Sequence, residues 1–237
     1  MNRLYLVRHG IAAEPADFSG PDTWRPLTPK GRRRFRRLAR ELARLEDPTG
    51  PTPLPTLVVS SPLVRAVQTA ELLAAALRVD TIEIHPDLTP EGDGVRLLRW
   101  LATWLEEGQG VALVGHDPSI SWLLAHLAEL SPRDAGRVRF RKGCIVRIDV
   151  AALPAVKDSQ SRWWLSPKTR ALRTGLPLER LPEEKRAAAE RKAAKKAALA
   201  AAPKVGAGAV EKKPAPESAA APRASQPRLV PVKPAKK

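Results

Sequence analysis

Four short apolar runs, each followed by a stretch with helical patterning, constrain the fold of this chain more than any other feature. The runs are rich in Leu, Val and Ile, and they comprise Leu4–Val7, Thr56–Val59, Thr81–Ile84 and Val111–Val114. The helices predicted after them run from Pro29 to about Leu45, and over Leu63–Leu77, Val95–Leu105 and Pro118–Leu130. Strands that alternate with helices indicate a three-layer α/β/α fold around a mostly parallel sheet.

Two further β-prone runs follow these four units. They comprise Cys144–Val150 and Arg162–Leu165, and we expect them to pair antiparallel at one edge of the sheet. The two tryptophans of the second run, Trp163 and Trp164, are adjacent and therefore face opposite sides of a strand. We expect one of them in the core and the other at the mouth of a cleft.

The first predicted helix carries an arginine-rich face. Thr28 and Pro29 form a helix start, with an N-cap followed by proline at the first helical position. Phe35, Leu38 and Leu42 recur at helical spacing, and six arginines stand between the apolar positions: Arg32, Arg33, Arg34, Arg36, Arg37 and Arg40. Such a face suits nucleic acid, but a solvated helix face is the more frequent meaning of this pattern.

The basic charge of the chain is concentrated in its last quarter. Residues 173–237 hold 16 Lys and Arg against 6 Asp and Glu, which places +10 of the formal net charge of +16 there. Few large apolar residues accompany these charges, so the segment cannot build a core. We expect one domain over residues 1–172 and a basic tail over 173–237, with a helix over Pro182–Ala202 and disorder over Pro203–Lys237.

Composition also bounds the class of protein. The single cysteine, Cys144, allows no internal disulfide, as is usual in a reducing compartment. Arg8 and His9 interrupt the N-terminal apolar run too early for a signal peptide, and no stretch approaches the ~20 apolar residues of a membrane span. The sequence therefore predicts a soluble cytoplasmic protein that does not bind membranes.

Unusual polar residues follow three of the four predicted strands. They comprise Arg8-His9-Gly10 after the first, Ser60-Ser61-Pro62 with the nearby Arg65 after the second, and Gly115-His116-Asp117 after the fourth. Ligands of open α/β sheets bind beyond the carboxyl ends of the strands, which all meet at one edge of a parallel sheet. We therefore expect two imidazoles and two guanidiniums to converge on one crevice.

That combination suits the transfer of a phosphoryl group. Arginine is a planar, permanently charged donor, so Arg8 and Arg65 can hold phosphoryl oxygens. A neutral imidazole is a competent nucleophile near neutral pH, and neighbouring guanidiniums favour the neutral form of His9. His116 can hold a further oxygen, and Arg65 lies near the start of its helix, where the helix dipole also attracts anions.

The same motifs resemble the signature of the histidine phosphatase superfamily, whose fold is that of phosphoglycerate mutase. They are Arg8-His9-Gly10, the segment from Ser61 to Thr69 that contains Arg65, and Gly115-His116. Within the superfamily, Arg25-Pro26-Leu27-Thr28, Pro86–Pro90, Gly92-Asp93 and Trp164–Pro167 resemble the SixA-type phosphohistidine phosphatases. The resemblance covers residues 1–172. Ile11 departs from it, because many SixA-type members carry an acidic or polar residue there.

The resemblance implies that His9 is phosphorylated transiently and that water then hydrolyses the phosphohistidine. Arg8, Gly10, Arg65 and His116 would form the phosphate pocket, and neither a metal nor an organic cofactor is implied. A poor leaving group would need a proton. Glu91 and Asp93 are the candidate acids, and for Glu91 we weigh a catalytic role against that of a solvated loop carboxylate.

Several functions remain open at this point. The foremost is a signal-transduction phosphatase that acts on a phosphorylated protein, such as a histidine-phosphotransfer domain, because short connections leave no lid over a small metabolite. The alternatives are a phosphatase or mutase of small phosphate esters, and a phosphate-binding module that depends on its tail. The tail itself can bind nucleic acid or polyphosphate, or it can be a solvated segment without a ligand.

Overall fold

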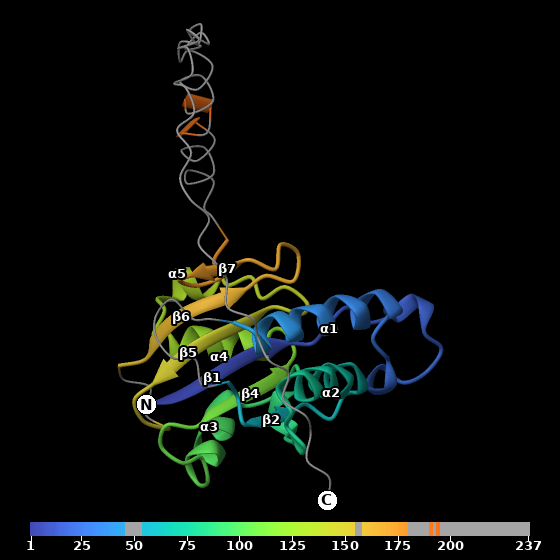
Figure 1. The fold of residues 1–237 in the computed structure, drawn as a ribbon, viewed down its shortest axis with the longest axis horizontal. Coiled ribbons are helices and arrows are strands. Elements are labelled where there is room, and N and C mark those ends of the chain that lie inside the picture. Colours follow the sequence, from blue (N-terminus) through green and yellow to red (C-terminus); the bar gives the residue numbers. More distant parts are fainter. Residues whose placement is uncertain (46–53, 155–157, 180–189, 192, 195–237) are drawn as a thin grey trace, which may run out of the picture. The chain divides into compact units, whose positions relative to one another are not determined.

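The fold is built on one mixed sheet of seven strands, in the order β3-β2-β4-β1-β5-β6-β7 (Figure 1). The computed structural model describes residues 1–45, 54–154, 158–179, 190–191 and 193–194. The chain divides into two compact units, Met1–Ala187 and Ala188–Lys237, and the sheet belongs to the first. The strands are β1 (Asn2–Arg8), β2 (Leu57–Ser60), β3 (Ile82–Ile84), β4 (Gly110–Gly115), β5 (Ile145–Val150), β6 (Gln160–Leu165) and β7 (Leu172–Thr174).

Strands β3, β2, β4 and β1 are mutually parallel, and they correspond to the four parallel strands that the sequence predicts. Every residue of β4 is buried, which agrees with its nearly continuous apolar sequence. In the register of β1 with β4, Arg8 lies opposite Gly115, and β2 ends opposite Val114. The three polar motifs therefore begin at one level on one edge of the sheet.

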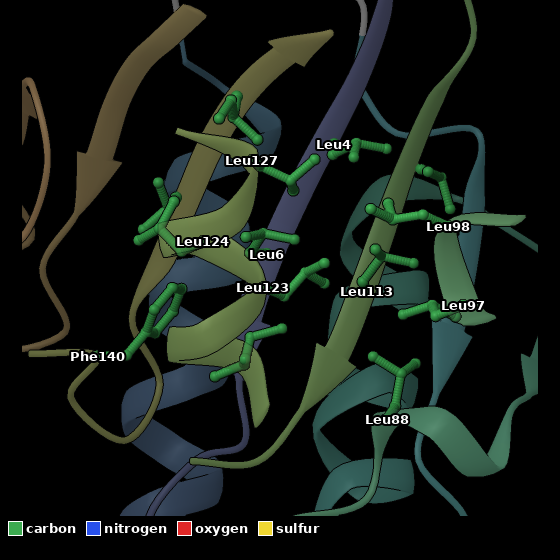
Figure 2. Close-up of a cluster of buried hydrophobic side chains, with 14 of the residues drawn as sticks. Leu4, Leu6, Leu88, Leu97, Leu98, Leu113, Leu123, Leu124, Leu127 and Phe140 are labelled. Atoms are coloured by element: carbon green, nitrogen blue, oxygen red, sulfur yellow. The ribbon is translucent and has the colours of Figure 1, made fainter. Parts of the chain in front are cut away.

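Helices cover both faces of the sheet and complete the predicted three layers. On one face lie α1 (Pro29–Ala43) and α2 (Val64–Leu77), packed with Tyr5 and Val7 of β1. On the other face lie α3 (Gly94–Ala102) and α4 (Ser119–Leu127), packed with Leu4 and Leu6 (Figure 2). The alternation of side chains along β1 thus sends successive residues into two separate cores.

Strands β5 and β6 pair antiparallel as expected, but they do not form the edge of the sheet, because β5 also pairs with β1 and β6 also pairs with β7. Trp163 is buried in the core, whereas Trp164 is half-buried and lines a cavity. A seventh strand was not predicted: β7 pairs with β6, and Val138 bridges Leu178. The compact unit therefore continues past Leu172, because the arginine- and glycine-containing sequence that follows is held by strand pairing rather than by a hydrophobic run.

The remaining elements are short. The loop after β1 contains two 3-10 turns, η1 (Pro15–Asp17) and η2 (Asp22–Trp24); a third, η3 (Pro86–Leu88), follows β3, and α5 (Pro132–Ala135) follows α4. Thr28 caps α1 as expected, by accepting a 2.9 Å hydrogen bond from the backbone N–H of Gly31. Within the described part of the chain, no helix is both long and apolar enough to cross a membrane.

Most of the expected basic tail lies outside the described residues. Of the helix predicted over Pro182–Ala202, the structure describes only Glu190, Arg191, Ala193 and Ala194, as helix, and it describes nothing from Pro203 onward.

Candidate functional site

The carboxyl ends of β1, β2 and β4 bring His9, Ser61 and His116 together. The backbone N–H of His9 donates to Gly115 O at 3.0 Å, and that of Ser61 donates to Val114 O at 2.9 Å. These bonds extend the parallel ladder one step beyond the strands and hold the motifs side by side. The ring centroids of His9 and His116 are 4.8 Å apart, with a tilt of 46°.

His9 is held as a neutral imidazole with one nitrogen free. Its Nδ1 lies 2.7 Å from the carbonyl oxygen of Gly10, which can only accept, so Nδ1 carries the proton and Nε2 keeps its lone pair. The side chain is 6% exposed. Burial, then the neighbouring His116 and the guanidiniums of Arg65 and Arg8, lower its pKa to about 2, although the hydrogen bond to Gly10 opposes this shift.

His116 is also buried and neutral. Burial, followed by the positive charge of Arg65, lowers its pKa to about 3. Its Nε2 lies 3.0 Å from the hydroxyl oxygen of Ser61, which also accepts from the backbone N–H of Leu63 at 3.3 Å. Ser61 therefore fixes the orientation of the His116 ring.

Arg65 projects from the first turn of α2 and is 4% exposed. Its two terminal nitrogens contact a single residue, Asp22: Nη1 donates to the backbone carbonyl at 2.8 Å, and Nη2 lies 3.0 Å from carboxylate oxygen Oδ2. Its Nε is buried and has no hydrogen-bond partner among the described residues. A buried N–H without a partner is costly, so this donor is suited to an incoming anion.

Arg8, the last residue of β1, is a second guanidinium held by a backbone carbonyl and a carboxylate. Its Nη1 donates to Phe140 O at 2.6 Å and lies 3.2 Å from a carboxylate oxygen of Asp117. Its Nε is likewise buried without a partner in the described chain. Both guanidiniums lie close enough to His9 to lower its pKa, and each keeps one N–H donor without a partner in the described chain.

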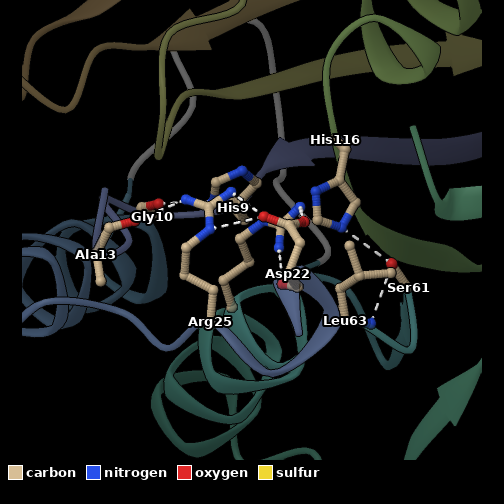
Figure 3. A network of polar contacts seen from close by, with 9 residues as sticks. His9, Gly10, Ala13, Asp22, Arg25, Ser61, Leu63 and His116 are labelled. Carbon is tan, nitrogen blue, oxygen red and sulfur yellow. Dashed lines mark hydrogen bonds and ion pairs between the residues drawn. The ribbon is translucent and has the colours of Figure 1, made fainter. Parts of the chain in front are cut away.

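Asp22 and Arg25 complete the network, and sequence reasoning did not assign them to the site (Figure 3). Nε of Arg25 donates to Asp22 Oδ1 at 2.8 Å, and Nη1 donates to Ala13 O at 2.7 Å. Burial raises the pKa of Asp22, but the hydrogen bond from Arg25 and the charge of Arg65 outweigh it, so this pKa is lower than usual. Arg25 belongs to the motif Arg25-Pro26-Leu27-Thr28, which is the one feature of the sequence that indicates its place in the site.

The structure does not bring Glu91 into this network. Glu91 is exposed, and it makes no hydrogen bond or ion pair with any described residue. It lines a cavity of about 340 Å³ with Pro118 and Trp122, and its charge acts on Arg65 only weakly. Asp93, the other candidate acid, is instead the N-cap of α3, where it accepts from Val95 N at 2.9 Å.

The site has the composition of an anion site, with guanidiniums and imidazoles in place of clustered carboxylates. Across the described residues, no group of three His, Cys, Asp or Glu side chains is arranged to hold a metal ion. The backbone N–H of Gly10 donates to Thr69 Oγ1 at 3.0 Å, which ties the loop after His9 to α2. Chemically, the arrangement offers one nucleophilic nitrogen surrounded by cationic donors.

Comparisons with known proteins place these motifs in context. Residues 4–90, which include Arg8, His9 and Arg65 but not His116, match the sequence model of the histidine phosphatase superfamily (branch 1). An uncharacterized protein of Picosynechococcus sp. is 34% identical over 176 residues, covering 70% of this chain and 96% of the relative.

Solved structures show the same fold. The structure of the protein histidine phosphatase SixA complexed with tungstate matches with a TM-score of 0.56 at 27% identity, covering 70% of this chain and 97% of that one. An Agrobacterium tumefaciens protein assigned as the phosphohistidine phosphatase SixA matches with a TM-score of 0.54 at 24% identity, covering 70% and 98%.

Proposed function

Because this chain belongs to the histidine phosphatase superfamily, we propose that it removes phosphate from phosphohistidine in proteins, with His9 as the nucleophile. One observation supports this role above the others. The hydrogen bond from Nδ1 to Gly10 leaves the lone pair of Nε2 free, in a pocket where burial keeps the ring neutral. A neutral nitrogen held in place is what attack on phosphorus requires.

In the first step, Nε2 of His9 attacks phosphorus and forms a new N–P bond. The P–N bond of the substrate breaks, its electron pair stays on the departing imidazole nitrogen, and that nitrogen takes a proton from solvent. In the second step, water attacks the phosphohistidine of the enzyme. Inorganic phosphate leaves, and the lone pair returns to Nε2.

The cationic side chains stabilise the charge on the transferred group. We assign the equatorial oxygens to Arg8, Arg65 and His116, because the two unsatisfied Nε–H donors belong to these arginines and His116 lies beside His9. Arg25 adds a third guanidinium on the same side as Arg65. Glu91 is exposed and uncommitted, so we retain it as the acid for substrates with poorer leaving groups.

Similarity to a protein histidine phosphatase supports a protein substrate. Phosphohistidine also suits a site that holds no acid in contact with His9 among the described residues, since its leaving imidazole needs less assistance than an alkoxide. Hydrolysis of small phosphate esters is the alternative. The two are separated by comparing kcat/KM for a phosphohistidine peptide with kcat/KM for sugar phosphates.

The decisive experiment traps the intermediate. Wild-type protein is mixed with a ³²P-labelled phosphohistidine peptide, quenched in alkali and analysed for acid-labile, alkali-stable label. We expect label on the wild type and none on His9→Ala, with turnover reduced by about 10³-fold or more. His126→Ala, which alters a half-buried histidine of α4 that stacks on Trp122, is the matched control. Label that persists on His9→Ala would contradict the proposal.

A further inference from the structure

Two adjoining cavities lie beside the loop that carries His9. The first, of about 270 Å³, is lined by Gly10 and Ile11, the two residues that follow His9. The second, of about 380 Å³, continues along α1. The cavities share Arg34, Pro167 and Lys168, so together they form one depression, which we call the basic groove.

The basic groove is lined by cations from three segments. Helix α1 contributes Lys30, Arg33, Arg34 and Arg37, and the segment after β6 contributes Lys168 and Arg170. Arg141 and Lys142, which precede β5, line its end nearest His9. No Asp or Glu of the described chain lines either cavity, so the field in the groove is strongly positive.

Most of these charges are free to meet a ligand. Arg33 and Arg37 are exposed and form no ion pair with any described residue. Two carboxylates that do not line the groove contact its cations. Oε1 of Glu41 lies 3.5 Å from Nη1 of Arg170, and Oε1 of Glu14 lies 3.5 Å from Nζ of Lys142. Both distances are long for ion pairs, and such exposed pairs contribute little.

The floor of the groove is apolar. Phe35, which is buried, Pro167 and Ile11 line the first cavity. Ile11 is uncharged and follows His9 and Gly10, so it leaves this end of the groove free of negative charge. Polyphosphate or a nucleic-acid backbone would use the cations but not this floor. A peptide with acidic and apolar side chains would use both.

We propose that the basic groove binds an acidic segment of the phosphoprotein substrate, next to the phosphohistidine that enters the site at His9. This inference depends on the proposed function and specifies its substrate class. The acidic side chains lie along Arg33, Arg34 and Arg37, and an apolar side chain rests against Phe35. The groove therefore distinguishes phosphoproteins by the sequence around their phosphohistidine, whereas Arg8, Arg65 and His116 contact only the phosphoryl group that all of them share.

The test uses two synthetic phosphohistidine peptides that differ only in their flanking residues, which are glutamates in one and glutamines in the other. We expect kcat/KM of the wild type to be about tenfold higher for the glutamate peptide at low salt, and the preference to disappear at about 0.5 M salt. The double variant Arg33→Glu/Arg37→Glu should lose the preference. All variants should keep the wild-type kcat/KM for p-nitrophenyl phosphate.

A matched variant separates the effect of the groove cations from the effect of the net charge of the protein. Arg36→Glu/Arg40→Glu makes the same change on the same helix, at two exposed positions that line neither cavity. It should retain most of the preference for the glutamate peptide. An equal loss in both double variants would mean that only overall charge matters, and would overturn the inference.

Other outcomes are equally decisive. Equal hydrolysis of the two peptides by the wild type overturns the inference that the groove binds an acidic segment, while it leaves the proposed function intact. Hydrolysis of p-nitrophenyl phosphate but of neither peptide overturns the protein-substrate function and the inference with it. If Arg33→Glu/Arg37→Glu loses binding to polyphosphate or an oligodeoxynucleotide but keeps the peptide preference, the groove serves a polyanion instead.

Discussion

A carboxylate oxygen of Asp22 lies 3.0 Å from Nη2 of Arg65, and the backbone carbonyl of Asp22 accepts a 2.8 Å hydrogen bond from Nη1. One loop residue thus engages both terminal nitrogens of a guanidinium that we assign to phosphate. Asp22 is 55% exposed and belongs to the loop between β1 and α1, so its carboxylate can turn outward while the core stays packed. The carboxylate of Asp22 and an oxyanion bound at Nε would therefore compete for the positive charge of Arg65.

This competition predicts that Asp22→Asn binds oxyanions more tightly than the wild type. Removing the negative charge frees Arg65 and Arg25 for the ligand and ends repulsion between the ligand and the carboxylate. We expect the inhibition constant for tungstate, measured against p-nitrophenyl phosphate, to fall about three- to tenfold. Asp17→Asn makes the same charge change at an exposed position of the same loop and should leave the constant unchanged. Weaker tungstate binding in Asp22→Asn would instead assign Asp22 to holding Arg65 in place.

The contact between Ser61 and His116 predicts that loss of the Ser61 hydroxyl lowers activity. Its hydroxyl lies 3.0 Å from Nε2 of His116, and Ser61→Ala would leave that buried nitrogen without its partner. We expect kcat/KM for p-nitrophenyl phosphate to fall about tenfold, since His116 would lose its fixed orientation. Ser60→Ala is the matched control, because Ser60 is equally buried but its hydroxyl donates to the backbone carbonyl of Ser61. Equal losses in the two variants would point to general destabilisation.

The parallel half of the fold and the convergence of its strand ends could be predicted because both follow from local sequence. The runs that form β1, β2 and β4 are apolar, short and followed by polar motifs. The sequence therefore predicts both that they are strands and that the polar motifs meet at one edge of the sheet. Strand β7 could not be read in this way. Its sequence, Leu-Arg-Thr, carries no strand signal of its own, and it is extended because β6 offers a free edge for pairing.

The residues of the site also divide into those that local sequence predicts and those that it does not. His9 and His116 directly follow strands and Arg65 lies in the first turn of α2, so the geometry of the sheet fixes where they meet. Asp22 and Arg25 lie in a loop whose path depends on tertiary contacts, such as the hydrogen bond from Arg25 to Ala13. Glu91 shows the converse: its place in a loop after β3 predicts an acid, and in the structure it is exposed and makes no hydrogen bond or ion pair with a described residue.

The position of Glu91 predicts a dependence on the leaving group. If it donates a proton to the departing oxygen, Glu91→Gln should lower kcat for phenyl phosphate about tenfold or more, because phenoxide is a poor leaving group. The same variant should change kcat for p-nitrophenyl phosphate and for a phosphohistidine peptide much less. Glu83→Gln, at an exposed position of β3, is the control for loss of a carboxylate. A uniform effect on all three substrates would exclude Glu91 as the acid.

The two buried imidazoles predict that stability falls in acid. Burial lowers the pKa of His9 to about 2 and that of His116 to about 3 in the folded protein, whereas an unfolded chain has a histidine pKa of about 6.5. Below about pH 6.5 the unfolded state therefore binds more protons than the folded state, so this contribution to stability is fully present above that pH and is lost as the pH falls toward about 3.

Urea unfolding of the wild type and of His9→Gln/His116→Gln at about pH 7 and about pH 4.5 measures this contribution. The carboxylates common to both proteins cancel in the comparison. We expect the free energy of unfolding of the wild type to drop by roughly 2 kcal/mol per histidine more than that of the variant. The same shift keeps Nε2 of His9 unprotonated in mild acid, so phosphorylation of the enzyme should persist at about pH 5. An equal drop in both proteins would mean that the two rings are accessible to protons in the native state, which would contradict their burial as the cause of neutrality.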